Sequence, residues 1–263
     1  MPPATDAAGW DPGQYLRFAD ARLRPAVDLL ARVPLSAPSV VVDLGCGPGT
    51  VTGLLRARFP EATLIGVDSS PAMLERARAA VPGARFVAAD FAAWRPETAP
   101  DLIFSNAALH WTGGHDRLFP ALLGLLAPQG VLAVQMPAMH DAPLRALQLA
   151  VAAEAPFAAY LRDVPDTARA ILPPAAYWDL LEPRCAALEM WETVYWHALR
   201  GARPVVEWAE GSSLRPFLAA LPEALRERFR EAYDRALAPH YPRRADGSVL
   251  LPFRRWFAVA RAG

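Results

Sequence analysis

Residues 39–58 read SVVVDLGCGPGTVTGLLRAR. The β-branched run over 39–44 predicts a short strand, and the pattern over 50–58 predicts a helix. Three glycines lie between them, where they let backbone approach a ligand closely. The segment therefore predicts a strand–turn–helix unit with a ligand at the turn, although a plain tight turn would have the same sequence.

The same alternation continues after this unit. Apolar runs predict strands over 62–67, 84–88, 101–105 and 130–135, and helical spacing predicts helices over 71–80 and 116–126. Both faces of these strands are apolar, as in a parallel sheet covered by helices on both sides. The fold class is therefore α/β, with a doubly wound sheet.

Further helices and strands flank this core. We expect an N-terminal helix over 14–32, later helices over 142–153, 175–181 and 222–238, and strands over 188–197 and 249–261. We expect one domain over 1–263, in which 1–38 carries the N-terminal helix and 39–136 forms the ligand-binding core. The segment 198–248 has helical spacing and is expected to form a cap inserted between the last two strands.

The charge balance bears on the kind of partner. The 263 residues carry 27 basic and 27 acidic side chains, so the formal net charge is zero. Nucleic acids and anionic membranes are usually bound by an excess of basic residues. Every basic side chain is an arginine, so arginine cannot be interpreted as chosen over lysine at any site. The composition favours a small-molecule partner and leaves the oligomeric state open.

Cysteine usage and the apolar segments bear on the cellular compartment. Cys46 and Cys185 are far apart, and neither stands at the spacing of a zinc site. The start, 1–14, lacks the regions of a signal peptide, and the most apolar stretch, 121–136, is interrupted by glycines and a proline. We therefore expect a cytoplasmic protein without a metal site.

The spacing of the glycine turn favours an amino-acid ligand over a pyrophosphate. Dinucleotide-binding turns follow GxGxxG, whereas this turn reads GxGxG and has Thr50 where the third glycine would stand. Pro48 removes one backbone donor. Asp43, just before the turn, would repel a phosphate and attract an ammonium group.

Two more carboxylates stand at the ends of the next predicted strands. Asp68 ends the second strand in GVDSS, where it can accept from the hydroxyls of a ribose. Asp90 follows the third strand in AADF, where it can accept from an exocyclic amine while Phe91 packs on a purine. Each aspartate alone could be a loop residue or a helix cap, but three at consecutive strand ends favour a nucleoside-containing ligand.

Four segments resemble, in order and spacing, the motifs of class I S-adenosylmethionine-dependent methyltransferases. They read DLGCGPG, GVDSSPAML, AADF and DLIFSNAALHW, and the resemblance covers 39–135. It implies a Rossmann-like, mostly parallel sheet of seven strands whose last strand is antiparallel. It also implies S-adenosylmethionine as the cofactor.

The resemblance assigns cofactor roles to individual residues. Gly45, Gly47 and Gly49, with Cys46 and Asp43 nearby, would surround the methionine part of the cofactor. The other assignments are Asp68 to the ribose hydroxyls, Ser69 and Met73 to the flanks of the adenine, Asp90 and Phe91 to its amine edge, Asn106 to the sulfonium side, and Tyr15 and Arg24 to an N-terminal helix over the cofactor. Arg24 would pair with the cofactor carboxylate, although a surface position is also open to it.

Tracts outside these motifs resemble, more narrowly, the trans-aconitate 2-methyltransferases. They read WDPGQYLRFADARLRPAVDLLARVPL, APQGVLAVQMP, TVYWH, SSLRPFL and GSVLLPFRRWFAVAR, so the resemblance extends over almost the whole chain. The chain departs from that family at His110, where glutamine commonly precedes the tryptophan. The resemblance implies esterification of a carboxylate of a small polycarboxylic acid, trans-aconitate above all.

A carboxylate acceptor determines what the acceptor site needs. It is ionised at neutral pH, so no general base is required, but cationic or hydrogen-bonding groups must hold it. The candidates for binding the acceptor are His110, Trp111, Tyr195, His197, Arg215, Arg254 and Arg255. Because side chains alternate along a strand, only one of Arg254 and Arg255 can face the site. By the same rule Tyr195 and His197 share one face, and we place Trp196 in the core.

Three other functions stay open at this point. One is a methyltransferase acting on a phenol, an amine or another acid; with a phenol or an amine, its pH profile should show a general-base limb. A nicotinamide-dependent dehydrogenase is disfavoured by the GxGxG spacing and by Pro48. A non-catalytic cofactor-binding protein would keep the glycine turn but would need no acceptor pocket.

Overall fold

The computed structural model describes residues 23–162, 164, 171–211 and 213–263. Contacts within the chain divide it into two compact units. The first, here called the sheet unit, contains the described residues up to Met136 together with Leu172–Glu192 and Trp256–Gly263. The second, the helical unit, contains the described residues of Pro137–Ile171 and Thr193–Arg255.

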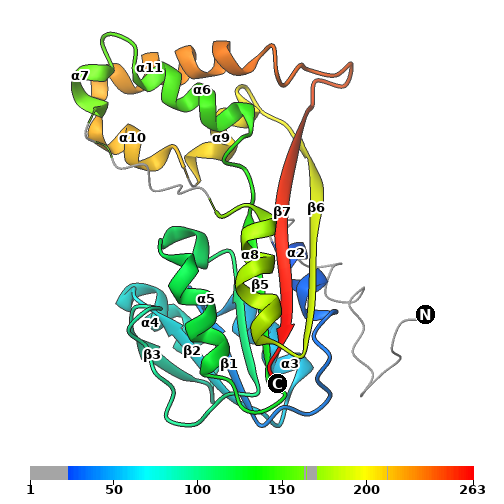
Figure 1. The fold of residues 1–263 in the computed structure, drawn as a ribbon. Helices are drawn as coiled ribbons and strands as arrows, with labels where there is room; N and C mark the ends of the chain where they lie inside the picture. The colour runs from blue at the N-terminus through cyan, green and yellow to red at the C-terminus, as the bar shows by residue number, and fades with distance from the viewer. Residues whose placement is uncertain (1–22, 163, 165–170, 212) are drawn as a thin grey trace. The chain divides into compact units, whose positions relative to one another are not determined.

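The strands form one seven-stranded sheet in the order β3-β2-β1-β4-β5-β7-β6 (Figure 1). Their bounds are β1 Val40–Leu44, β2 Thr63–Asp68, β3 Arg85–Ala88, β4 Leu102–Asn106, β5 Val131–Pro137, β6 Ala187–Leu199 and β7 Val249–Arg261. The first five strands pair in parallel. β2 and β3 follow on one side of β1, and the chain then crosses to the other side of β1 to form β4 and β5. The expected doubly wound α/β sheet is confirmed.

β7 runs antiparallel to β5, as the methyltransferase resemblance implies. At one end Ala262 N donates to Gly130 O at 2.8 Å, and at the other end Ala138 N donates to Arg254 O at 2.9 Å. Residues near the end of β7 therefore lie beside the start of β5, and earlier residues of β7 lie beside the end of β5.

The helices of the sheet unit follow the expected alternation. They are α2 Arg24–Leu30, α3 Thr50–Arg58, α4 Pro71–Ala80, α5 His115–Gly124 and α8 Pro174–Leu181, with 3-10 turns over Leu109–Trp111 and Glu182–Arg184. α3 contacts β1 and β2, and α4 contacts β2 and β3. The bounds of α3 and α4 match the predicted ones, because their start signals are local: a glycine before Thr50, and Ser70 capping a helix that begins with Pro71. The expected N-terminal helix is described only from Leu23 onward, and there α2 ends at Leu30.

An aromatic cluster packs α5 and α8 together within the sheet unit. Tyr177 stacks on Trp256 with ring centroids 4.2 Å apart, and Phe119 lies 4.9 Å from Tyr177. His115 completes the cluster, because its Nδ1 lies 2.5 Å from the Tyr177 hydroxyl and its Nε2 lies 2.9 Å from Leu109 O. Burial lowers the pKa of His115. Both ring nitrogens of His115 are therefore engaged in structural contacts.

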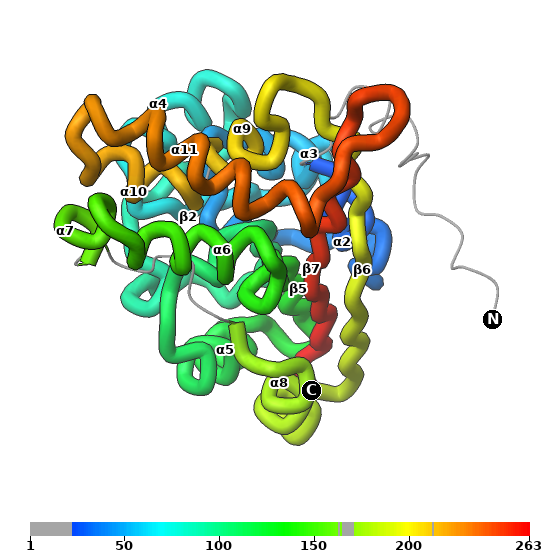
Figure 2. The backbone as a smooth tube through the Cα atoms, turned by 90° about the horizontal axis from the view of Figure 1, so that it is seen from above, coloured from blue at the N-terminus to red at the C-terminus, as the bar shows by residue number. Residues whose placement is uncertain are grey.

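The helical unit has an apolar core of its own. Its helices are α6 Pro143–Ala152, α7 Ala158–Leu161, α9 Pro204–Glu210, α10 Arg215–Ala220 and α11 Glu223–Leu237. α6 and α11 lie side by side (Figure 2), and the Tyr233 hydroxyl donates to Leu144 O at 2.7 Å. The unit is larger than the expected 198–248 insertion, because α6 and α7 join it from the chain after β5. The spacing of α6 predicts an apolar face but does not identify the helix that covers it.

Candidate functional site

The three glycines after β1 have left-handed backbone conformations, with φ of 82° at Gly45, 52° at Gly47 and 88° at Gly49. A Cβ on Gly45 would collide with the Cβ of Ala108, and one on Gly49 would lie 3.0 Å from Cα of Ala77. A Cβ on Gly47 would meet nothing within 4 Å. The outer glycines are therefore needed for packing, and the backbone at Gly47 faces open space that a ligand can enter.

Asp68, at the end of β2, holds this turn in place. Its Oδ2 accepts from Gly47 N at 3.0 Å, and its Oδ1 accepts from Ser70 N at 2.8 Å. Gly45 N and Cys46 N both donate to Val67 O. A carboxylate has about four lone-pair sites, so the half-buried Asp68 keeps acceptor capacity for a ligand beside the turn.

Asp43 lies beneath the turn and is 2% exposed. Burial raises its pKa to about 7, a hydrogen bond from Thr52 opposes the rise, and the nearby charge of Asp68 adds to it. The Thr52 hydroxyl donates to Asp43 Oδ2 at 2.6 Å. Asp43 is thus a buried, hydrogen-bonded group whose charge depends on pH near neutrality, and its partner Thr52 was not predicted from the sequence.

Cys46 contributes only backbone to the ligand side of the turn. Its side chain is buried in an apolar cluster with Leu74, Ala77 and Phe86. Burial raises the pKa of the thiol above its usual range, so the group stays protonated. A role for Cys46 at the cofactor is therefore limited to its main chain.

Four other predicted cofactor residues also follow β2 or β3. Ser69, Met73 and Asp90 are exposed, and Asp90 Oδ1 accepts from Ala92 N at 2.8 Å. Phe91 is half-buried, with its Cζ 3.3 Å from the position that a Cβ on Gly45 would take. The structure thus places the Phe91 ring against the glycine turn and leaves the other three side chains accessible.

Asn106 is the last residue of β4, and its direct neighbour in the register of the two strands is Gln135, near the end of β5. Gln135 is 0% exposed. Among the described residues, Asn106 Oδ1 and both polar atoms of the Gln135 side chain are buried without a hydrogen-bond partner. Sequence reasoning missed Gln135, although a lone polar residue in the apolar run GVLAVQMP was a usable signal.

Within the helical unit, β6 and β7 have one buried side and one accessible side. Tyr195 and His197 are buried on one side, where the His197 ring lies 4.6 Å from Trp208 and 6.0 Å from Phe253. Trp196, on the other side, is 64% exposed, so the expectation that it lies in the core is wrong. β6 is an edge strand and the Trp196 side borders an open pocket, so the indole stays accessible.

Arg255 belongs to the buried side and is 8% exposed. Its guanidinium carbon lies 4.5 Å from the centroid of the Phe253 ring. Burial lowers its pKa to about 10, an effect that Tyr195 opposes, so Arg255 is still cationic at neutral pH. Within the described part of the chain, its Nε has no hydrogen-bond partner and no carboxylate pairs with it.

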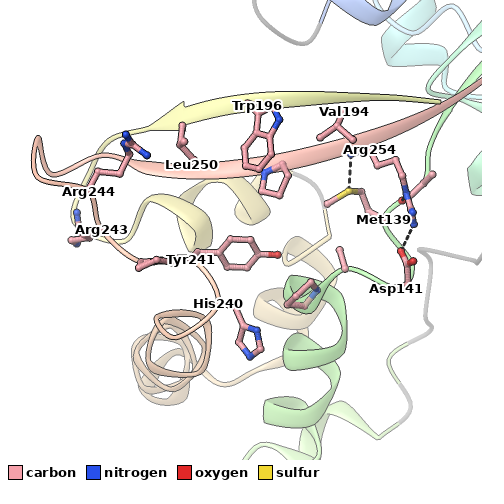
Figure 3. A pocket seen from close by; sticks show the side chains of 15 residues that line it. Met139, Asp141, Val194, Trp196, His240, Tyr241, Arg243, Arg244, Leu250 and Arg254 are labelled. Carbon is pink, nitrogen blue, oxygen red and sulfur yellow. Dashed lines mark hydrogen bonds and ion pairs between the residues drawn. The ribbon is translucent and has the colours of Figure 1, made fainter.

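Arg254 points to the opposite side, into a pocket of about 560 Å³ (Figure 3). It pairs with Asp141 at 2.5 Å, and its Nε donates to Ala138 O at 3.0 Å. The pocket is lined by Ala138, Met139, Asp141, Ala142, Pro143, Val194, Trp196, His240, Tyr241, Pro242, Arg243, Arg244, Leu250, Pro252 and Arg254. Arg254 and Arg255 thus lie on opposite sides, as the strand alternation requires, and only Arg254 has a carboxylate partner among the described residues.

Comparison with known proteins gives the family of the chain. A family model described as "Methyltransferase domain" matches residues 41–130. A protein of Methylobacterium radiotolerans named trans-aconitate 2-methyltransferase is 52% identical over 97% of this chain and 98% of the relative. A protein of the same name from Paracidovorax citrulli is 51% identical over 96% of this chain and 98% of its own length. The chain belongs to the trans-aconitate 2-methyltransferase family.

Solved structures agree with the fold of this member of the trans-aconitate 2-methyltransferase family. The crystal structure of the YcgJ protein from Bacillus subtilis matches with a TM-score of 0.62 at 14% identity, over 90% of this chain and 97% of the other. At that identity the match supports the fold alone. The narrow resemblance seen in the sequence is confirmed by the relatives, whereas the individual site residues stay predictions.

The remaining site residues predicted for this trans-aconitate 2-methyltransferase family member are placed as follows. Tyr15 lies outside the described residues. Arg24 is exposed at the start of α2 and pairs with Asp28 at 3.8 Å. His110 is half-buried, with its ring 4.6 Å from the exposed Trp111, and both belong to the sheet unit. Arg215 is exposed at the first residue of α10 in the helical unit.

None of the helices in the described part of the chain is long and apolar enough to cross a membrane. No group of three or more His, Cys, Asp or Glu side chains in that part of the chain is arranged to hold a metal ion.

Proposed function

We propose that this chain transfers a methyl group from S-adenosylmethionine to a carboxylate of trans-aconitate and forms a methyl ester. Family membership over nearly the full length supports the reaction. The observation that carries the acceptor class is Arg255, a buried cation without a carboxylate partner in the described chain. A buried charge is costly unless it is paired, and an acceptor carboxylate would supply the missing partner.

The residues at the glycine turn fit the proposed cofactor. The open space at Gly47 gives room for the methionine part, and Asp68 keeps lone pairs for the ribose hydroxyls. Phe91, against the turn, offers a ring to the adenine, and the unpartnered Asn106 Oδ1 gives an acceptor near the sulfonium. S-adenosylmethionine, when bound, supplies an electrophilic methyl group.

The protein's part in the reaction is positioning rather than proton transfer. The acceptor carboxylate has a reference pKa of about 4 and is already a nucleophile at neutral pH. Holding it in line with the methyl carbon and the sulfur can contribute roughly 7–11 kcal/mol. Arg255 would bind another, non-reacting carboxylate of the acceptor, while His197 and Phe253 beside it would exclude water.

Other candidates on the chain have weaker structural support as anchors. Arg254 already pairs with Asp141, and Arg215 is exposed. His110 and His197 would act as hydrogen-bond donors to the acceptor and not as bases. The balanced charge supports a small-molecule substrate over a nucleic acid, and we place the activity in the cytoplasm.

An acceptor panel tests the substrate. The purified chain is incubated with methyl-labelled S-adenosylmethionine and, in turn, trans-aconitate, cis-aconitate, citrate, a monocarboxylate, a phenol and an amine. We expect esters of unsaturated polycarboxylates, with trans-aconitate giving the highest kcat/KM. Preferential methylation of the phenol or the amine would overturn the proposal.

A further inference from the structure

We propose that Gln135 is a positioning residue that orients Asn106 toward the bound cofactor, an inference that rests on the function proposed above. Gln135 is fully buried near the end of β5, directly beside Asn106 at the end of β4. Three of the polar side-chain atoms of this pair, Asn106 Oδ1 and Gln135 Oε1 and Nε2, are buried without partners among the described residues.

Three unpartnered atoms at one place call for an explanation. Native proteins satisfy the great majority of buried polar groups, because burying an amide without hydrogen bonds costs free energy. A leucine or methionine at 135 would avoid that cost and would suit the apolar strand around it. The amide is therefore better explained by a state in which it is used.

The sheet geometry allows the two amides to pair. Register partners on neighbouring parallel strands point their side chains to the same face of the sheet. Turned head to tail, Gln135 Nε2 can donate to Asn106 Oδ1 while Asn106 Nδ2 donates to Gln135 Oε1. That arrangement satisfies all three atoms and fixes the Asn106 amide in one orientation, with its second N–H directed away from Gln135.

The backbone at the same point supports a functional role. Ala107, the residue after Asn106, has a φ of 52°, which is uncommon for a residue other than glycine. Its N–H donates to Gln135 O at 2.9 Å. Ala108 then packs where a Cβ on Gly45 would stand. Gln135 thus holds the main chain that joins Asn106 to the glycine turn, and strained conformations of this kind cluster at functional sites.

The backbone contact and the proposed amide pair together define the role of Gln135. Its carbonyl keeps the Asn106–Ala108 segment against the turn, and its amide sets which Asn106 atoms meet the methionine part of the cofactor. Gln135 itself is fully buried and, in this proposal, acts through Asn106. We assign the paired arrangement to the cofactor-bound protein, because it satisfies the three amide atoms that have no partner among the described residues.

The first test compares two fully buried glutamines in the absence of ligand. Gln148 is also 0% exposed, but it donates to Ser213 O at 2.9 Å and accepts from Arg145. We expect Gln135→Met to leave the melting temperature unchanged or raised, because it removes unpartnered polar atoms. Gln148→Met should lower the melting temperature, because it leaves the hydrogen-bond partners of Gln148 without it.

The second test measures binding of S-adenosylmethionine and S-adenosylhomocysteine by calorimetry, without any acceptor. We expect Gln135→Met to weaken both by about tenfold, the effect of one or two lost hydrogen bonds. In an Asn106→Ala background the same change should have little further effect, because Gln135 acts through Asn106. Gln135→Glu should bind well at pH 6, where a buried carboxylic acid can both donate and accept, and less well at pH 8.

The results separate the inference from the proposed function. If the wild-type chain does not bind S-adenosylmethionine, the proposed function fails. If the wild type binds and Gln135→Met binds equally well, or if the two methionine variants are destabilised alike, the positioning role is overturned while the proposed function stands.

Discussion

The backbone amide of Gly47 donates to the side chain of Asp68 at 3.0 Å, which ties the glycine turn after β1 to the end of β2. One carboxylate therefore shapes the turn, and it is also the group that we predict to bind the ribose. Because the same group also accepts from Ser70 N, the start of α4 depends on it as well.

Replacing Asp68 tests that double role. We expect Asp68→Ala to weaken S-adenosylmethionine binding by about 1.5–3 kcal/mol, the range for a hydrogen bond to a charged group. Asp101 is a matched control, because its carboxylate also accepts two backbone amides, from Ser39 and Val40, at the amino-terminal ends of β1 and β4. Asp101→Ala should reduce stability but not cofactor affinity. Calorimetry that finds Asp68→Ala and the wild type equal in affinity would refute the assignment.

The raised pKa of Asp43 predicts how stability depends on pH. Burial raises this pKa to about 7, above the value of about 3.9 in an unfolded chain. Between these values the folded protein binds a proton that the unfolded chain has lost. The contribution of the Asp43 proton to the free energy of unfolding is therefore fully present below about pH 4 and is lost as pH rises through 7.

Asp43→Asn isolates that contribution, because asparagine stays neutral and can still accept from Thr52. In urea titrations from pH 4 to 8, the free energy of unfolding of the variant relative to the wild type should increase with pH. The change should amount to a few kcal/mol at most. Thr52→Val should move the pH range over which this stability is lost to higher pH, since the Thr52 hydrogen bond lowers the pKa of Asp43. Parallel curves for Asp43→Asn and the wild type would contradict the assignment.

The effects of replacing Arg255, Arg254 and Arg215 on activity should differ according to the burial and ion pairing of each arginine. We expect Arg255→Met to lower kcat/KM for trans-aconitate by roughly 30-fold or more, the effect of removing one partner of a desolvated charge pair. Its stability should be unchanged or higher, because methionine replaces a buried cation. Arg254→Met and Arg215→Met should keep most of the activity, and all three should bind S-adenosylmethionine normally.

The comparison with a shorter acceptor sharpens this prediction. The loss in Arg255→Met should shrink for an analogue that lacks the carboxylate held by Arg255. Wild-type kinetics in Arg255→Met together with a large loss in Arg254→Met would place the anchor in the pocket of Figure 3 instead.

The pH profile tests the absence of a general base. For a carboxylate acceptor, kcat should show no ascending limb that depends on a histidine between pH 6 and 8. His110→Asn and His197→Asn should chiefly raise KM. A limb that persists in both variants but disappears in Asp43→Asn would report Asp43. A near-total loss of kcat in one histidine variant, rescued at higher pH, would indicate a base and a hydroxyl acceptor.

The sequence predicted best what is encoded locally. The bounds of α3, α4 and β7 followed from caps, turns and apolar runs within a few residues. It did not predict pairings between distant segments, such as Thr52 with Asp43 or α6 with α11. Trp196 was misplaced because alternation along a strand separates two faces but does not say which face is covered. Gln135 was missed although it is a lone polar residue in an apolar strand, and that its amide has no partner is recognised only once its surroundings are known.

The most direct test of the account is the product of a single reaction. The chain is incubated with trans-aconitate and S-adenosylmethionine carrying a deuterated methyl group, and the product is analysed by mass spectrometry and by its sensitivity to base. We predict one deuterated methyl group on trans-aconitate, in an ester that base hydrolyses, together with an equal amount of S-adenosylhomocysteine. Cofactor binding without any labelled ester, under conditions in which the chain is folded, would contradict the central claim.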